Sequence, residues 1–331
     1  MADGLTVIIP SCGRIDILKE NLTNILDCPE FTAGQNHIII IDDSPGNLCA
    51  SLKAVFLHKP ISIVSTGGRR GPSFARNLGA KLAQSKLIAF IDDDVIVSQG
   101  WLAAGVAAMA AYQETVGVVG PIVLPDDKPA DYFSHFTNVA KPGAYPAGNI
   151  WFRRDLFLAC GGFDEDFFDP LTGMFHHEDS AAAFRALKVG PILYVPEMLV
   201  FHPAHSRHWL TPIRRGKKAI FEALLHRKYP VEYDEKGAVR LGPLYLRRLR
   251  VRVRVAGTLG LLAVIATRHI GIVLCWIALC GIVEVIYAMG IQNAMTMRWR
   301  LPLAMMGGMA FQVSFTIYWA LGCIKFRHFV L

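Results

Sequence analysis

The chain of 331 residues is 53% hydrophobic and only 18% charged, and its mean hydropathy is +0.35. This composition excludes a disordered chain and is more apolar than that of an ordinary soluble enzyme. The net charge of +7 is unevenly divided, because residues 240–331 contain eleven basic side chains and one acid, Glu284. Basic charge beside long apolar runs indicates a membrane surface and argues against a nucleic-acid partner.

The first hundred residues alternate between apolar strand-like runs and helical patterns. Short β-rich runs at 5–9, 37–41 and 86–91 are separated by helical spacing over 14–27 and 72–85. Each of the strand-like runs is continuously apolar, which is typical of a mainly parallel α/β sheet covered on both faces. Ligands of such sheets bind at the carboxyl ends of the strands.

Acidic clusters directly follow two of these strand-like runs. Asp42 and Asp43 end the run IIIDD, and the three carboxylates Asp92, Asp93 and Asp94 end FIDDD. Adjacent carboxylates repel one another, and a divalent cation that also holds a diphosphate resolves this repulsion. We expect a metal site after the third run, and a solvated acidic turn is the alternative.

Two further positions have chemical interest because each opens a helical pattern. Glu178 and Asp179 precede the pattern that ends near Gly190, where acids serve either as caps or as a general base. Arg76 follows a Gly-Pro turn, where free N–H groups and a basic side chain are available to a phosphate, although Arg76 pairing with a surface acid is the alternative.

Two apolar runs near the C-terminus, 270–291 and 301–324, are long enough to cross the hydrocarbon core of a membrane, which takes about 20 residues. The shorter run 255–267 predicts an interfacial or re-entrant segment, and the arginine-rich stretch 247–254 fits either a strand or a helix. Flanking basic residues predict a cytoplasmic catalytic domain.

The seven cysteines form no C-x-x-C pair, which favours a reducing compartment. The expected division is a catalytic domain at 1–230, a basic connector at 231–269 and a two-helix transmembrane hairpin at 270–331.

Seven motifs, in this order and spacing, resemble family 2 glycosyltransferases. They are VIIPSCGR at 7–14, IIIDDSP at 39–45, GPSFARNLGA at 71–80, FIDDDV at 90–95, GNIWFRRDLF at 148–157, GGFDEDF at 161–167 and HHEDSAAAFRALKVG at 176–190. The resemblance covers residues 5–210. It implies a GT-A fold (a Rossmann-like, mainly parallel α/β sheet), a nucleotide-sugar donor and inversion at the anomeric carbon.

The resemblance also implies which residues bind the donor. These positions are the nucleoside-contacting Asp42 and Asp43, together with Arg76, Asp92, Asp93 and Asn149.

The resemblance further implies a metal site and a catalytic base. Asp92 and Asp94 form the D-x-D pair that binds Mg²⁺ or Mn²⁺, and His202 is either a third ligand or a plain loop histidine. Asp179 is the base that deprotonates the acceptor hydroxyl, with Glu178 beside it. A carboxylate suits this task because an alcohol is a weak nucleophile and must lose its proton during attack.

The Q-x-x-R-W motif of processive synthases is not matched by HSRHW at 205–209, so we expect single additions. The leading interpretation is a membrane-anchored, metal-dependent, inverting glycosyltransferase on the cytoplasmic face. Its partners would be a nucleotide sugar, membrane lipids and a lipid-linked or membrane-proximal saccharide acceptor. One alternative is a polyprenyl-phosphate glycosyltransferase, and another is a catalytically idle GT-A scaffold, against which Asp92, Asp94 and Asp179 argue.

Overall fold

The chain divides into two compact units. The first unit contains Met1–Pro129 and Phe136–Pro203, and the second contains Ala130–His135 and Ala204–Leu331. The computed structural model describes residues 2–33, 35–46, 48–125, 132–134, 137–204, 208–236, 239–241, 244–246, 248–289 and 301–331.

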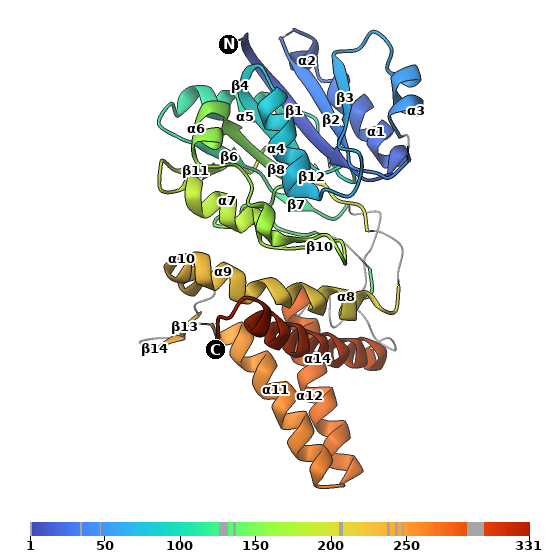
Figure 1. The fold of residues 1–331 in the computed structure, drawn as a ribbon, viewed down its shortest axis with the longest axis vertical. Helices are drawn as coiled ribbons and strands as arrows, with labels where there is room; N and C mark the ends of the chain where they lie inside the picture. Colours follow the sequence, from blue (N-terminus) through green and yellow to red (C-terminus); the bar gives the residue numbers. More distant parts are fainter. Residues whose placement is uncertain are drawn as a thin grey trace. The chain divides into compact units, whose positions relative to one another are not determined.

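A seven-stranded sheet forms the centre of the first unit (Figure 1), with strand order β11-β6-β8-β4-β1-β2-β3. The strands are β1 (Ala2–Ser11), β2 (His37–Asp42), β3 (Ile61–Ser65), β4 (Ser85–Ile91), β6 (Gly117–Val119), β8 (Asn149–Arg153) and β11 (Ile192–Tyr194). Neighbouring strands are parallel except at β8, which runs antiparallel to β4 and β6. The mainly parallel α/β sheet of the GT-A fold is therefore confirmed.

Helices cover both faces of this sheet. They are α1 (Ile15–Leu26), α2 (Pro29–Ala33), α3 (Leu48–Val55), α4 (Pro72–Leu82), α5 (Trp101–Ala111), α6 (Arg154–Ala159) and α7 (Glu178–Ala186), with the short 3₁₀ helix η1 (Glu165–Phe167). The expected helices at 14–27 and 72–85 correspond to α1 and α4.

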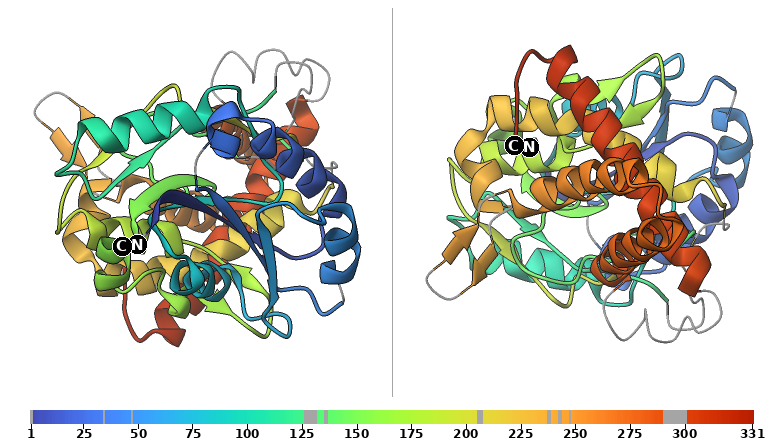
Figure 2. Two further views of the ribbon diagram at one scale, coloured as in Figure 1. Left: turned by 90° about the horizontal axis from the view of Figure 1, so that it is seen from above. Right: turned by 90° about the horizontal axis from the view of Figure 1, so that it is seen from below.

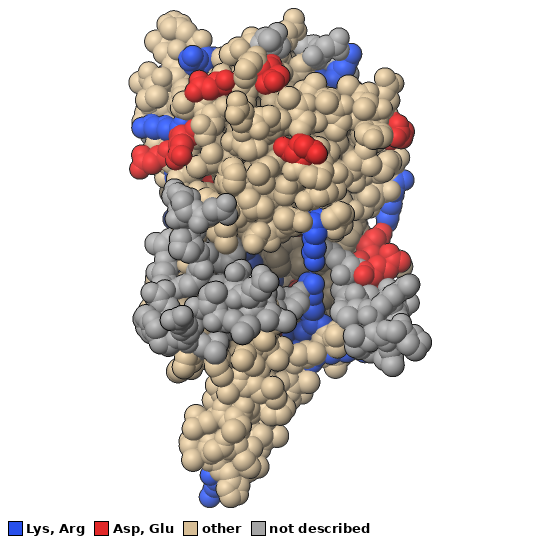
Figure 3. All heavy atoms as spheres, turned by 180° about the vertical axis from the view of Figure 1, so that it is seen from behind, with Lys and Arg blue, Asp and Glu red and all other residues tan. Residues whose placement is uncertain are grey.

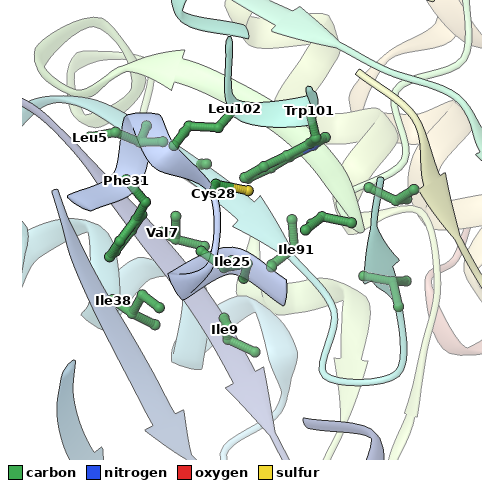
Figure 4. Close-up of a cluster of buried hydrophobic side chains, with 14 of the residues drawn as sticks. Leu5, Val7, Ile9, Ile25, Cys28, Phe31, Ile38, Ile91, Trp101 and Leu102 are labelled. Atoms are coloured by element: carbon green, nitrogen blue, oxygen red, sulfur yellow. The ribbon is translucent and has the colours of Figure 1, made fainter. Parts of the chain in front are cut away.

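Alternation along β1 and β2 divides the core into two hydrophobic clusters, because successive strand residues point to opposite faces. Val7 and Ile38 pack with α1 and α5 side chains such as Ile25 and Trp101 (Figure 4). On the other face, the neighbouring Ile8 packs with residues of α4, α6 and α7. Both faces of the sheet are thus buried, as its continuous apolar strands predict.

Two apolar runs of the sequence each form two separate strands in the structure. Residues 116–123 form β6 and then β7 (Ile122–Val123), and residues 192–201 form β11 and then β12 (Val200–Phe201). A side chain at Gly120 would collide with the carbonyl oxygen of Met198, so the chain turns where only glycine fits. The strands β7 and β12 pair in a separate three-stranded sheet with β5 (Ile96–Val97), and β9 (Phe168–Asp169) pairs with β10 (Met174–Phe175).

The order of the strands fixes where a ligand site belongs. From β1 the sheet grows through β2 to β3 on one side, and β4 then starts growth on the other side of β1. In open α/β sheets, ligands bind outside the carboxyl ends of the strands at such a reversal. The residues at this edge are those that follow β1, β2 and β4.

The second unit is mainly helical (Figure 2). Its elements are α8 (Thr211–Lys217), the 3₁₀ helix η2 (Lys218–Phe221), α9 (Glu222–Lys228), α10 (Pro230–Lys236), β13 (Val239–Leu241), β14 (Leu244–Leu246), α11 (Leu249–Ala266), α12 (Ile270–Met289) and α14 (Leu301–Lys325). The arginine-rich stretch thus enters a helix, α11. The predicted boundary after residue 230 falls at the first residue of α10, and the three-part division remains a prediction.

Among the described residues, one helix is long and apolar enough to cross a membrane, Pro302–Lys325, with 44% of its most apolar window buried. The apolar part of α12, Ile270–Glu284, is shorter than that criterion. Residues 292–300, which we expect to form a short loop between the two apolar runs, lie outside the described residues. A pair of spans at 270–291 and 301–324 therefore remains a prediction.

Candidate active site

The carboxyl ends of β1, β2 and β4 bring most of the predicted acids to one edge of the first unit's sheet. The register pairs Ser11 at the end of β1 with Asp42 at the end of β2, and Ile8 with Phe90 of β4. The acidic turn after β4 therefore lies beside the residues that follow β1.

Asp93 is the inward-facing member of the acidic triad. Its carboxylate is fully buried and accepts hydrogen bonds from the Ser11 hydroxyl at 2.7 Å and the Cys12 amide at 3.3 Å. Burial raises the pKa of Asp93, although the nearby Arg14 guanidinium acts in the opposite direction. This side chain ties the end of β4 to the end of β1, and its contact with a donor remains a prediction.

Arg14 is a site residue that the sequence analysis missed. Its Nη2 lies 2.6 Å from Asp93 Oδ1 and its Nη1 lies 2.6 Å from Asp94 Oδ2, while 47% of the side chain is exposed. Burial opposes its charge, but the carboxylates of Asp93 and Asp94 outweigh this effect and raise the pKa of Arg14. The available signal was a basic residue directly after the first strand, at the same edge as the acids.

Asp94 faces His202 across the small sheet. Pairing of β12 with β5 places Phe201 opposite Ile96, and His202 Nε2 lies 3.7 Å from Asp94 Oδ1. His202 Nδ1 lies 3.0 Å from the Pro203 carbonyl oxygen. Because a carbonyl only accepts, Nδ1 donates in this contact and Nε2 is the nitrogen that faces Asp94. This orientation through the second nitrogen is typical of metal-binding histidines.

Arg76 joins Asp92 to the start of α7. Its Nη2 lies 2.6 Å from Asp92 Oδ1 and its Nη1 lies 3.5 Å from Glu178 Oε1. The Arg76 side chain is only 4% exposed. Burial opposes its charge, but Asp92 and Glu178 outweigh this effect and raise the pKa of Arg76. The Asp92 carboxylate also lies over Gly148, where an added Cβ would be 2.7 Å from Oδ2, which explains the glycine in GNIW.

The predicted ligands Asp92, Asp94 and His202 fit a divalent cation in donor type, since two carboxylates and a correctly oriented imidazole flank one turn. Asp94 and His202 already face each other, whereas Asp92 is directed to Arg76. Among the described residues, the ligand atoms of the three do not form a set lying within 4.8 Å of one another. Metal binding would therefore require Asp92 to turn from Arg76 or to contribute through its other oxygen.

The two acids that open α7 have different environments. Glu178 is buried and ion-paired with Arg76, whereas Asp179 is half-buried. Asp179 Oδ1 accepts a hydrogen bond from the Ser180 amide at 2.6 Å. His177 precedes them with a positive φ of 70°, which ends the preceding loop sharply and starts the helix. Asp179 is thus the more accessible carboxylate for a reacting hydroxyl.

Asp42 and Asp43 organise the loops beside them. Asp43 accepts hydrogen bonds from the backbone amides of Arg70 and Gly71, each at 2.8 Å, and from the Thr66 hydroxyl. The buried Asp42 accepts from the amide and hydroxyl of Ser44 at 2.9 and 2.6 Å. Asp43 thereby positions the loop that leads into α4, and nucleoside contacts by both residues remain predictions.

Asn149 lies at the same end of the sheet but is turned inward. It is fully buried, its Oδ1 accepts from the Trp101 indole at 2.9 Å, and its Nδ2 donates to the carbonyls of Pro121 and Met198 at 3.0 and 2.6 Å. These bonds give Asn149 a role in joining the two sheets. Its role in holding the donor remains a prediction.

Comparison with known proteins gives the family. The family model described as "Glycosyl transferase family 2" matches residues 6–180. The pre-mycofactocin glycosyltransferase of Mycobacterium tuberculosis is 24% identical over 62% of this chain and 44% of its own length. The glucosyl-dolichyl phosphate glucuronosyltransferase of Haloferax volcanii is 29% identical over 29% of this chain and 35% of its own length. The chain thus spans less than half the length of these curated relatives.

A solved structure supports the fold over nearly the whole chain. The mannosyltransferase PcManGT from Pyrobaculum calidifontis, in complex with GDP-Man and Mn²⁺, superposes with a TM-score of 0.57. It covers 97% of this chain and 86% of its own, at 17% sequence identity, so the likeness concerns the fold alone. Together with the family match over more than half of its residues, the sheet and its acidic edge show that this chain belongs to glycosyl transferase family 2.

Proposed function

We propose that the protein transfers a single sugar from a nucleotide-sugar donor to a lipid-linked or membrane-proximal saccharide acceptor, with inversion at the anomeric carbon. One observation carries this proposal. The facing pair Asp94 and His202 lies on the same sheet edge as Asp92, which Arg76 links to the helix start that holds Asp179. Family membership supports the same reaction.

Asp92, Asp94 and His202 are the residues proposed to hold Mg²⁺ or Mn²⁺. A divalent ion there would stabilise the negative charge that develops on the leaving diphosphate. The Mn²⁺ complex of the mannosyltransferase from Pyrobaculum calidifontis supports this choice of ion. Arg14, half-exposed beside Asp94, supplies a further positive charge at the edge where the diphosphate would lie.

Asp179 is the proposed general base. It accepts the proton of the acceptor hydroxyl while that oxygen forms a bond to the anomeric carbon, and the bond from this carbon to the diphosphate oxygen breaks. The nucleoside diphosphate leaves with the bonding electrons. Attack from the face opposite the leaving group inverts the anomeric configuration.

Arg76 and Glu178 are proposed as positioning residues for this reaction. A single buried guanidinium contacts Asp92 on one side and Glu178 on the other, and Glu178 is adjacent to Asp179 in the chain. This connection fixes the position of Asp92 relative to Asp179. The rate of transfer depends on that position, because displacements of about 1 Å between reacting groups are costly.

The acceptor class follows from the tail and from one relative. The apolar, basic tail favours an acceptor at a membrane. The basic residues that flank its apolar runs favour a catalytic unit on the cytoplasmic side. The name of the Haloferax volcanii relative, whose substrate is a glucosyl-dolichyl phosphate, supports a saccharide already attached to a lipid.

The test is nucleotide release from a panel of UDP-, GDP- and dTDP-sugars, with and without membrane lipid extract and Mn²⁺. The proposal predicts release with one donor that requires the metal and increases with lipid extract. Release stimulated by a pure polyprenyl phosphate would identify the bare lipid phosphate as acceptor instead. An absence of release and of donor binding in every condition would favour the idle scaffold.

A further inference from the structure

The helices α11 and α12 form a hairpin that α14 crosses near one end. Gln312 Nε2 of α14 donates to the Arg254 carbonyl of α11 at 3.1 Å, and Thr316 shares a hydrogen bond of 2.9 Å with Thr258. On α12, the contact with α14 is at Gly281, whose carbonyl oxygen would lie 2.6 Å from a Cβ on Gly308. These contacts place the crossing at Arg254–Thr258 of α11 and near Gly281 of α12.

Residues 259–279, which we call the hairpin end, lie beyond this crossing. The two helical arms pack on each other there, because a Cβ on Gly260 would collide with the Trp276 ring. The Trp276 indole also donates to the Gly257 carbonyl, just before the hairpin end, at 2.9 Å. The exposed large apolar side chains of the hairpin end are between 48% and 74% accessible. They are Leu259, Leu262, Ile265, Ile270, Ile272, Leu274 and Leu279.

The surface of the hairpin end is almost entirely apolar. Its sequence holds no Asp, Glu or Lys, and its basic residues are Arg268 and the neighbouring His269. Figure 3 shows a projection without red or blue atoms except for a basic side chain at its tip. A helix that docks in a protein groove needs one apolar stripe, whereas an all-round apolar helix is typical of contact with lipid.

Basic side chains lie at both ends of this apolar surface. Arg250 and Arg252 are exposed before the crossing, and Arg268 and His269 are exposed at the turn. Sixteen residues from Arg252 to Arg268 make about 24 Å of helix at 1.5 Å per residue. Arginine side chains extending outward at both ends bring this length near the hydrocarbon thickness of about 30 Å.

The one acid of α12 is neutralised within the hairpin. Glu284 is buried and accepts two hydrogen bonds from the Arg254 guanidinium of α11, at 2.9 and 3.2 Å. Ionisable groups at membrane depth occur paired in this way and face the interior of a helix bundle. The pair also fixes the two arms relative to each other at the crossing.

The contacts of α14 are different, although it is the helix that hydropathy selects as a span. Phe315 and Trp319 are 4% and 6% exposed, and Ser314 donates to the Ile213 carbonyl of α8 at 2.9 Å. The Trp319 indole donates to the Val330 carbonyl at 2.8 Å. Several sides of α14 are therefore occupied by protein within the second unit.

From these contacts we propose that the α11–α12 hairpin crosses the bilayer, with Arg268 and His269 at the headgroups of the opposite leaflet, and that α14 does not cross. The hairpin end is then surrounded by hydrocarbon. This inference rests on the membrane association proposed above and names the segment responsible, but it is independent of the catalytic assignments.

The test is a labelling experiment on the full chain, expressed in bacteria after replacement of its seven cysteines by serine or alanine. A membrane-impermeant maleimide is applied to intact spheroplasts and to lysed cells that carry His269→Cys, with the exposed Lys53→Cys as control. We expect labelling at 269 in intact spheroplasts and labelling at 53 only after lysis. Labelling at 269 only after lysis, or under neither condition, overturns the crossing. Labelling of Phe329→Cys, an exposed position after α14, in intact spheroplasts is what a further crossing by α14 requires, and it would refute the statement that α14 does not cross.

A second arm tests membrane association itself. Flotation with vesicles is compared for the double variant Leu262→Glu/Leu274→Glu and for Val231→Glu, a matched exposed apolar residue on α10. We expect at least a tenfold loss of vesicle-bound protein for the double variant and wild-type binding for Val231→Glu. Absence of flotation of the wild-type protein refutes membrane association, and equal flotation of both variants with wild type refutes the role of the hairpin end.

Discussion

The carboxyl edge of the sheet buries charged side chains, whereas the hairpin end exposes apolar ones. At the sheet edge, charged side chains such as Asp93 and Arg76 are almost completely buried. At the hairpin end, large apolar side chains such as Leu262 and Ile270 are 60% and 74% exposed. Each arrangement is costly for folding in water, because charges favour solvent and apolar surface favours burial. We therefore propose a charged ligand at the sheet edge and lipid around the hairpin end.

The largest expected effect is at the base. Asp179→Asn keeps the size of the side chain but cannot accept the acceptor proton, so sugar transfer should fall by about 10²–10⁴-fold. Donor affinity should remain close to wild type, because the proposed donor and metal residues are unchanged. Transfer kinetics and titration calorimetry with the donor measure the two quantities.

Asp155→Asn is the matched control, since its carboxylate is 60% exposed and pairs only locally with Arg154 among the contacts described. It should behave as wild type. A collapse of donor affinity in Asp179→Asn, with transfer from bound donor retained, would make Asp179 a binding residue.

A second effect is expected at Arg76. Arg76→Lys keeps the charge, but an ammonium cannot reproduce the fork that contacts both Asp92 and Glu178. Removal of such an orienting partner typically costs 10–100-fold in activity or metal affinity. We expect the Mn²⁺ concentration for half-maximal activity to rise and transfer to fall within this range.

The control for Arg76 is Arg154→Lys, because Arg154 donates mainly to backbone carbonyls of Ala80 and Lys81. An unchanged Mn²⁺ requirement in a folded Arg76→Lys protein would reject the positioning role.

A smaller effect is expected at the basic end of α11. Arg250 and Arg252 are exposed on the first turn of α11, where they can contact headgroups. The double variant Arg250→Gln/Arg252→Gln should weaken binding to anionic vesicles by about 2 kcal/mol, at about 1 kcal/mol per basic residue. Binding to neutral vesicles should change little.

The matched control is Lys53→Gln/Lys59→Gln, which removes two exposed charges from the first unit. Equal losses for both double variants would mean that net charge, rather than the position of the arginines, determines binding.

The smallest expected effect is the pH dependence of the stability of the second unit. Burial lowers the pKa of His226 below its ordinary 6.5; Arg248 and His328 act in the same direction, and Asp234 opposes them. Since the unfolded chain gains a proton near pH 6.5 and the folded chain does not, stability is lost as pH falls below 6.5, by at most about 1.4 kcal/mol per pH unit.

Thermal unfolding in detergent at pH 5.5 and 7.5 measures this dependence. His226→Gln should reduce the difference between the two melting temperatures, and the exposed His58→Gln should leave it unchanged. An undiminished difference in His226→Gln would assign the pH dependence to other groups.

Sequence patterns predicted the sheet and its acidic edge because both depend on local signals. Continuous apolar runs indicated β1, β2 and β4, and the acids after them marked the edge at which the strands end. The strand β3 was not anticipated, since its residues alternate between half-buried and exposed and give no continuous apolar run.

The orientation of individual site residues depends on partners far away in the chain, which no local pattern contains. Asp93 turns inward because Ser11, 82 positions away, donates to it, and Asn149 is buried by bonds to Trp101 and Met198. The hydropathy of α14 likewise did not show that α8 covers part of it, since that contact joins residues 101 positions apart.

The most direct test of the proposed active site is donor binding with and without Mn²⁺ for wild type and Asp94→Asn. Asp94 faces His202 and Arg14, so its replacement removes a proposed ligand from the centre of the sheet edge. We predict that wild type binds one nucleotide sugar only when Mn²⁺ is present, and that folded Asp94→Asn loses this dependence together with most of its turnover. Full turnover of the Asp94→Asn protein in the presence of EDTA would contradict the metal site and, with it, the proposed mechanism.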